Sequence, residues 1–270
     1  MPLVRKTRLD FTQYVSHTDN LADYLQRKAA KHSKKIVTKL SNKIRKTKDP
    51  EALRATIKAT KAEYKGLFKG MQTQVRRNLA TTLLSGAHQV SALGSIKRDK
   101  GRLSILDGLT KNVEFYTEAY YRRIVEPKLR AFIVANKKSA TFERDFNQLV
   151  KRSLLETQRY WTSVADTVAG RAYTYGMLKG AKMRGHTRFE LVAVIDERTT
   201  DFCRSIDGKT FKIDDGLESI EGLANLRGNN ILHGPWSLVS EGKTSSKQMK
   251  ATGFMTPPFH SHCRTRLHVS

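Results

Sequence analysis

The sequence predicts an α+β protein: a mainly helical N-terminal two-thirds with long helices, followed by a small C-terminal α+β unit with a short antiparallel sheet. Three observations lead to this prediction. Apolar residues recur at helical spacing from Leu21 to Leu178, as in amphipathic helices. After Gly185 the pattern changes to β-branched and aromatic runs, which favour strands. The 270 residues are 39% hydrophobic, which is enough to form a buried core.

Residues 18–102 are predicted to form a basic helical hairpin and a linker, preceded by an extended arm over residues 1–17. Thr18-Asp19-Asn20 is expected to cap the first helix, because short polar side chains accept hydrogen bonds from free helical N–H groups. Asp49-Pro50-Glu51 is expected to start the second helix in the same way, with proline in its first turn. Residues 85–102 are small, polar and glycine-containing, which predicts a linker or a mobile loop.

Residues 103–185 are predicted to be a region of long helices. Apolar positions from Leu106 to Ile124 mark one helix, and Pro127 is expected to kink or end it because proline lacks the N–H that a helix needs. Ser139 is a candidate cap for the next helical segment, whose apolar stripe reaches Leu178.

The last region, residues 186–270, is predicted to hold the sheet. Phe189–Ile195 and Lys209–Ile213 read as two strands of a hairpin that turns at Ile206-Asp207-Gly208. Thr265–Val269 is expected to be a short final strand. Residues 215–256 are rich in glycine, serine and asparagine and are predicted to form a long loop.

The charge of the chain points to a polyanionic partner. It has 50 Lys+Arg against 25 Asp+Glu, a formal net charge of +25, and residues 1–102 alone hold 24 basic and 7 acidic side chains. The lysines that lie near one face of the first predicted helix are Lys28, Lys31, Lys35, Lys39 and Lys43. Such a face suits either a phosphate backbone, contacted without sequence specificity, or an acidic protein surface. A merely solvated helix face is the alternative.

The composition also argues against two classes of protein. No run approaches the roughly 20 apolar residues that span a bilayer, and the first residues lack the apolar segment of a secretory signal. Neither a membrane protein nor a secreted one is expected. Cys203 and Cys263 are the only cysteines, so a reducing interior is expected rather than a disulfide scaffold.

Residues 140–270 carry three short motifs in a fixed order. They follow D-x-R-T-x-x-x-C from Asp196 to Cys203, D-G-K from Asp207, and P-P-x-H-x-x-C-R from Pro257 to Arg264. In this order and spacing they resemble the phage Mu F-like head morphogenesis family of tailed bacteriophages, whose members are minor head proteins. The residues that carry the resemblance, besides the cysteines and the histidine, are Asp196, Arg198, Thr199, Asp207, Gly208, Pro257, Pro258 and Arg264.

The resemblance implies a minor head protein that is present in few copies inside the capsid near the portal vertex, after assembly in the host cytoplasm. It implies binding to the portal protein in head morphogenesis and in DNA packaging or ejection. Packaged double-stranded DNA and the scaffold or major capsid protein are further expected partners. The basic helices lie outside the matching residues, so their role rests on charge and helicity alone.

The motifs also contain candidate metal ligands. Cys203, His260 and Cys263 offer thiolate and imidazole groups that suit zinc, and a small loop-rich unit would gain stability from such an ion. A fourth ligand would come from Asp201, His262 or His233, or from water. The alternative is that the two thiols simply pack and hold the last strand against the first.

An enzyme is the second functional alternative. Asp196, Glu197, Asp201, Asp207 and His260 would be the acidic and basic groups of a metal-dependent enzyme acting on nucleic acid or on cell wall. Turn and cap roles explain these residue types more simply, and the sequence has no H-E-x-x-H motif, glycine-rich phosphate loop or nucleophile elbow. A noncatalytic protein is therefore expected. A third reading is a host-derived basic DNA-binding protein with a zinc ribbon.

Overall fold

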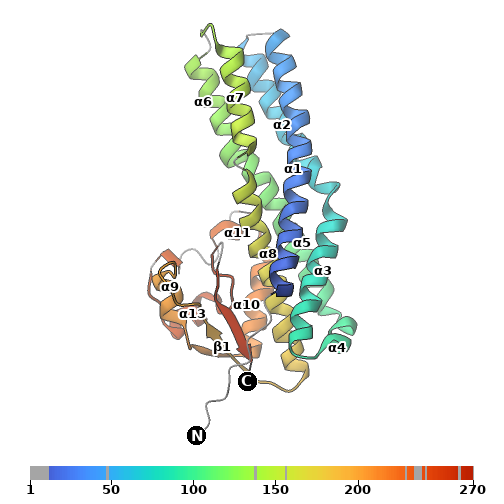
Figure 1. Cartoon of the computed structure of the whole chain (residues 1–270), viewed down its shortest axis with the longest axis vertical. Helices are drawn as coiled ribbons and strands as arrows, with labels where there is room; N and C mark the ends of the chain where they lie inside the picture. Colours follow the sequence, from blue (N-terminus) through green and yellow to red (C-terminus); the bar gives the residue numbers. More distant parts are fainter. Residues whose placement is uncertain are drawn as a thin grey trace.

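A computed structural model confirms the mainly helical α+β fold (Figure 1). It describes residues 12–46, 49–136, 139–155, 157–228, 230–233, 239–240, 242–260 and 263–269. The helices of the N-terminal two-thirds are α1 (Thr12–Lys46), α2 (Pro50–Lys69), α3 (Gln72–Gln89), α4 (Leu93–Arg98), α5 (Gly101–Tyr120), η1 (Tyr121–Val125), α6 (Glu126–Asn136), α7 (Phe142–Leu155) and α8 (Thr157–Met183). These helices form an elongated shaft, and the C-terminal unit lies beside one half of it.

The start of the chain is helical over more residues than expected. Helix α1 begins at Thr12, so the extended arm is wrong for residues 12–17, and residues 1–11 lie outside the described chain. The predicted cap at Thr18-Asp19-Asn20 is also wrong, because these residues lie inside α1, more than a turn after its start at Thr12. The cap at Asp49 is confirmed: its carboxylate accepts hydrogen bonds from Glu51 N at 3.1 Å and Ala52 N at 3.0 Å.

The linker predicted over residues 85–102 is wrong, because most of the segment is helical and Gly86 serves close packing rather than a turn. Helix α3 continues through Gly86 to Gln89, and α4 and the start of α5 fill most of the remainder. A Cβ atom at Gly86 would lie 2.1 Å from the carbonyl oxygen of Tyr173 in α8, and one at Gly176 would lie 1.9 Å from that of Leu83. The backbones of α3 and α8 therefore touch where both helices have glycine.

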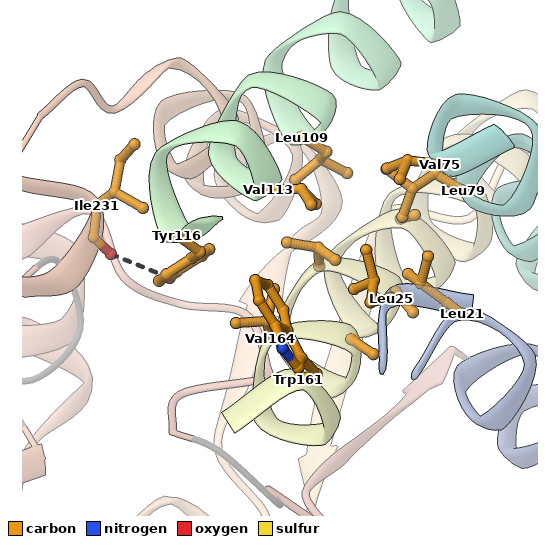
Figure 2. Packing of buried hydrophobic residues seen from close by; sticks show 14 of the residues in the cluster. Leu21, Leu25, Val75, Leu79, Leu109, Val113, Tyr116, Trp161, Val164 and Ile231 are labelled. Carbon is orange, nitrogen blue, oxygen red and sulfur yellow. Dashed lines mark hydrogen bonds between the residues drawn. The ribbon is translucent and has the colours of Figure 1, made fainter. Parts of the chain in front are cut away.

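Helix α8 lies at the centre of the shaft. Leu21 of α1, Val75 of α3 and Leu109 of α5 surround the α8 residues Trp161 and Val164 (Figure 2). Nearly every α8 residue from Val164 onward to Leu178 is buried, which is the pattern of a helix enclosed on all sides. No described helix is long and apolar enough to span a bilayer.

Pro127 disturbs its helix without ending it. The turn before it, η1, is π-helical, with the Glu126 N–H bonded to the Tyr121 carbonyl, and α6 continues across the proline. A π turn adjusts the hydrogen-bond register where the proline leaves one donor missing. The segment that follows Ser139 consists of two helices, α7 and α8.

The C-terminal unit holds a three-stranded antiparallel sheet of β1 (Arg188–Val192), β2 (Thr210–Lys212) and β3 (Arg266–Val269), in the order β2-β1-β3. The final strand is thus confirmed. Strand β1 ends before the predicted Ile195 because the Ala193 N–H bonds to the Asp207 side chain, at 2.8 Å, instead of to a strand. Val194 and Ile195 are 49% and 50% exposed.

Helices replace much of the loop predicted over residues 215–256: α10 (Ile213–Asn225), α11 (Asn230–His233) and α13 (Ser246–Thr252). A further helix, α9 (Asp201–Ile206), precedes β2. The predicted antiparallel pairing of the first two strands is confirmed, and α9 lies in the connection between β1 and β2. The apolar positions Ile213, Leu217 and Ile220 give α10 a helical period, which its glycines conceal in the sequence.

The C-terminal unit shares one hydrophobic core with the shaft. Helix α10 packs on α5 so closely that a Cβ atom at Gly108 would lie 2.7 Å from the Ala224 carbonyl oxygen. Asn112 Nδ2 donates to the Leu223 carbonyl at 3.2 Å, and the Tyr116 hydroxyl donates to the Ile231 carbonyl at 3.3 Å (Figure 2). The shaft therefore fixes the position of the small sheet.

The close contact between α3 and α8 leads to the first testable prediction. Gly176→Ala places a methyl group against the Leu83 backbone, which cannot move aside as a side chain can. We expect the free energy of unfolding, measured by urea denaturation, to fall by about 2–3 kcal/mol or more. Gly66→Ala, in α2 with nothing within 4 Å of its Cβ, is the control and should be neutral or gain up to about 1 kcal/mol. Equal effects of the two substitutions would contradict this packing argument.

Candidate metal centre

The first motif places Cys203 in the opening turn of α9. Thr200 is the N-cap of this helix, and its hydroxyl accepts a hydrogen bond from the Cys203 backbone N–H at 3.2 Å. A threonine in this position satisfies one of the free donors of the helix start. The cap therefore fixes the backbone that carries the Cys203 side chain.

The third motif brings His260 and Cys263 to the same place. Cys203 Sγ lies 3.1 Å from His260 Nε2, although the two residues are 57 positions apart. The ligand atoms of Cys203, His260 and Cys263 all lie within 4.8 Å of one another. The two cysteines are 4% and 5% exposed, and His260 is half-buried. The structure thus assembles three of the candidate ligands into one cluster, which we call the Cys–His–Cys cluster.

The two thiols titrate as a pair. A hydrogen bond with Cys263, supported by His260, Thr200 and Thr265, lowers the pKa of Cys203 below its ordinary value although burial opposes this. The same hydrogen bond, together with burial, raises the pKa of Cys263. Cys203 is therefore the favoured thiolate of the pair, and Cys263 keeps its proton and directs it toward the Cys203 sulfur.

A second bridge joins the same two segments. Arg264 forms a bidentate ion pair with Asp196, with Arg264 Nη1 lying 2.6 Å from Asp196 Oδ2. The Asp196 carboxylate also accepts a hydrogen bond from the Arg198 backbone N–H at 2.9 Å. The backbone N–H of Asp196 donates to the Thr199 hydroxyl at 2.8 Å. Arg264 is the largest cause that lowers the pKa of Asp196 far below its usual range. Asp196 is therefore engaged in holding the loop after β1.

The remaining motif residues have structural contacts of the same kind. Gly208 has φ +74°, a left-handed conformation that favours glycine, and its N–H donates to the Leu191 carbonyl at 2.8 Å. Asp207 bonds the Ala193 N–H, as described above. Pro257 and Pro258 are buried and joined by a cis peptide bond, and the Thr174 hydroxyl of α8 donates to the Pro257 carbonyl at 3.2 Å. The second motif thus holds the connection between β1 and β2, and the third fastens the C-terminal unit to the shaft.

Several predicted site residues do not join the cluster. Asp201 and Glu197 are exposed, and among the described residues neither contributes a ligand atom to the cluster. His262 and the side chain of His233 lie outside the described part of the chain. Sequence reasoning missed Arg204, which bonds the carbonyl oxygens of Asp196 and Thr199. Its place one residue after Cys203 gave no signal of this.

A small cleft adjoins the cluster. Its volume is about 20 Å³, and its lining includes Thr200, Cys203, His260, Arg264 and Thr265. A space of this size holds about one water molecule. The arrangement therefore offers two sulfur ligands, one nitrogen ligand and a position for a single small molecule.

The predicted lysine face lies on α1, in the shaft. Lys28, Lys31, Lys35, Lys39 and Lys43 are all exposed, while Leu21, Leu25 and Leu40 of the same helix are buried. Helix α1 carries nine lysines and arginines and two aspartates. The structure thus leaves a positively charged stripe on the outer side of the shaft.

The comparisons with known proteins give no relative: no family model, no curated protein and no solved structure matches this chain.

The bridge between Asp196 and Arg264 makes the second prediction. Asp196→Asn removes the charge from the ion pair and should lower the melting temperature at pH 7. Because the pair lowers the pKa of Asp196, its contribution is present above the ordinary pKa of about 4 and is lost as the pH falls through the lowered value. The difference between the two proteins should therefore shrink in scans below about pH 4.

Glu197→Gln is the matched control for this prediction. Glu197 is the next residue and is exposed, so its substitution should change the melting temperature much less at pH 7. A difference between Asp196→Asn and the unmodified chain that persists unchanged to low pH would contradict the role given to the ion pair.

Proposed function

We propose that the chain is a minor head protein of a tailed phage that acts inside the capsid near the portal vertex, in head morphogenesis and in DNA packaging or ejection. One observation supports the proposal most directly. The motif segments that resemble the phage Mu F-like family meet in space through the Asp196–Arg264 pair and the Cys–His–Cys cluster. The resemblance implies that these motifs belong to one compact unit, and this contact is consistent with that.

The same unit supports binding rather than catalysis. Asp196 and Asp207, two candidate acidic groups, are engaged in loop and strand contacts. Cys203 is buried, and the cleft beside it holds about one water molecule. A catalytic site needs its reacting groups within reach of a substrate. We therefore give these residues a structural role.

The positively charged stripe of α1 is the proposed binding surface. Lys28 and Lys43 are 15 residues apart, which corresponds to roughly 22 Å along a helix. Lysines over such a length suit the phosphates of double-stranded DNA or an acidic surface of the portal protein. Contact is local, because a protein present in few copies neutralises little of the charge of a packaged genome. Scaffold and major capsid proteins are the further partners proposed.

The third prediction is association with the portal. The full chain, mixed with the portal protein of the same phage, should be recovered with it by pull-down at low and moderate salt. Replacing Lys28, Lys31, Lys35, Lys39 and Lys43 with glutamine should weaken this association if the stripe faces the portal. Absence of association of the unmodified chain at every salt concentration would contradict the proposed function.

The fourth prediction concerns DNA. Binding to a random duplex should fall steeply with salt, and the five glutamine substitutions should reduce the slope of log K against log salt by up to about 4.5. A control variant changes the same number of exposed charges elsewhere: Lys97, Lys128, Lys212, Lys243 and Lys247 to glutamine. It should change the slope much less. Equal slopes for the two variants would remove α1 as the DNA-binding surface.

A further inference from the structure

We propose that Cys203, His260 and Cys263 bind one Zn²⁺ ion, with a water molecule in the small cleft as the fourth ligand. The proposal concerns this chain alone and does not rest on the proposed function. It is carried by the positions of three side chains that come from two segments of the C-terminal unit.

The distances between the three ligand atoms are close to those found around a bound zinc ion. Zinc bonds of about 2.0–2.3 Å in a tetrahedron place neighbouring ligand atoms roughly 3.5–4 Å apart. The three ligand atoms here lie within 4.8 Å of one another, and Cys203 Sγ is 3.1 Å from His260 Nε2. Shifts of about an ångström or less would therefore bring all three onto one ion.

The polypeptide around the ligands fixes their positions. Thr200 caps the helix turn that carries Cys203, and the Cys263 N–H bonds to the His260 carbonyl at 3.3 Å, which holds the two third-motif ligands close together. The side chains of Thr200 and Thr265 line the same small cleft as Cys203.

The ligand set selects the ion. Two thiolates with one imidazole are soft and borderline donors, which suit zinc and disfavour magnesium and calcium. The cleft provides the fourth position, because its volume of about 20 Å³ admits one water molecule. An open fourth position usually marks a catalytic zinc. Here the ion joins two chain segments and the cleft holds about one water molecule, so the ion is assigned a structural role.

The position of the site defines what zinc would stabilise. Cys203 follows β1 through the loop that Asp196 holds, and Cys263 lies three residues before β3 begins at Arg266. An ion at the cluster joins these segments beside the pairing of β1 with β3. Its binding free energy would add to the stability of the C-terminal unit, because the unfolded chain does not hold the three ligands together.

The test uses the full chain purified without chelators. Elemental analysis should find about one zinc per chain. After removal of the metal, added Co²⁺ should give the thiolate-to-cobalt charge-transfer absorption and the intense visible bands of a tetrahedral site, and Zn²⁺ should displace it. Zinc should also raise the melting temperature of the metal-free chain.

Substitutions place the ion at these residues. Cys203→Ser and His260→Gln should each lower zinc affinity at least tenfold, and Cys203→Ser should weaken the charge-transfer absorption. His268→Gln, on β3 and outside the cluster, is the matched control and should bind like the unmodified chain. His260 is only half-buried, so its variant keeps the test valid if a cysteine variant fails to fold.

Four results would overturn the proposal. The first is a chain that contains no zinc when purified and binds none when it is added. The second is stoichiometric binding of another metal in place of zinc. The third is zinc affinity that both Cys203→Ser and His260→Gln leave unchanged. The fourth is a disulfide between Cys203 and Cys263 in the chain purified under reducing conditions. None of these measurements involves the portal, so failure here is distinguishable from failure of the proposed function.

Discussion

The burial of α8 on all sides is the constraint on which the rest of the molecule depends. Its glycines let the α3 backbone approach, and its other faces receive α1, α5 and α10. The same helix reaches the motif unit, because Leu178 lies against the α10 glycine Gly216 and Thr174 bonds the Pro257 carbonyl. The sheet and its cluster therefore take their position from the hydrophobic core of the shaft.

Hydrophobic periodicity predicted the elements in which apolar side chains lie on one buried face and polar side chains on the opposite, exposed face. The buried leucines of α1 are an example, whereas the Asp49 cap follows from capping chemistry. Periodicity failed where a glycine lets two elements pack closely. Gly86 in α3 and Gly216 in α10 favour loops by composition, but both lie in helices against a neighbour that leaves no room for a Cβ atom. Local sequence does not distinguish a glycine that permits a turn from one that permits close contact.

The candidate site was predictable in its residue types but not in its partners. Motif order pointed to Cys203, His260 and Cys263 as a group, and the structure brings them together. Nothing local indicated that Asp196 would pair with Arg264, 68 residues away, because tertiary pairing has no periodic signature. The same holds for Thr200, whose value as a cap depends on a six-residue helix that was read as part of a hairpin connection.

The charged and polar side chains of the C-terminal unit bond one another, whereas those of helix α1 in the shaft face solvent. In the C-terminal unit the motif side chains face one another: a carboxylate meets a guanidinium, and two thiols meet an imidazole. Such groups are already matched and have little to offer a distant partner. Helix α1 instead directs its leucines inward and leaves lysines in solvent, where like charges repel along its length. A polyanion would relieve that repulsion, which is why we propose the shaft, and not the C-terminal unit, as the binding surface.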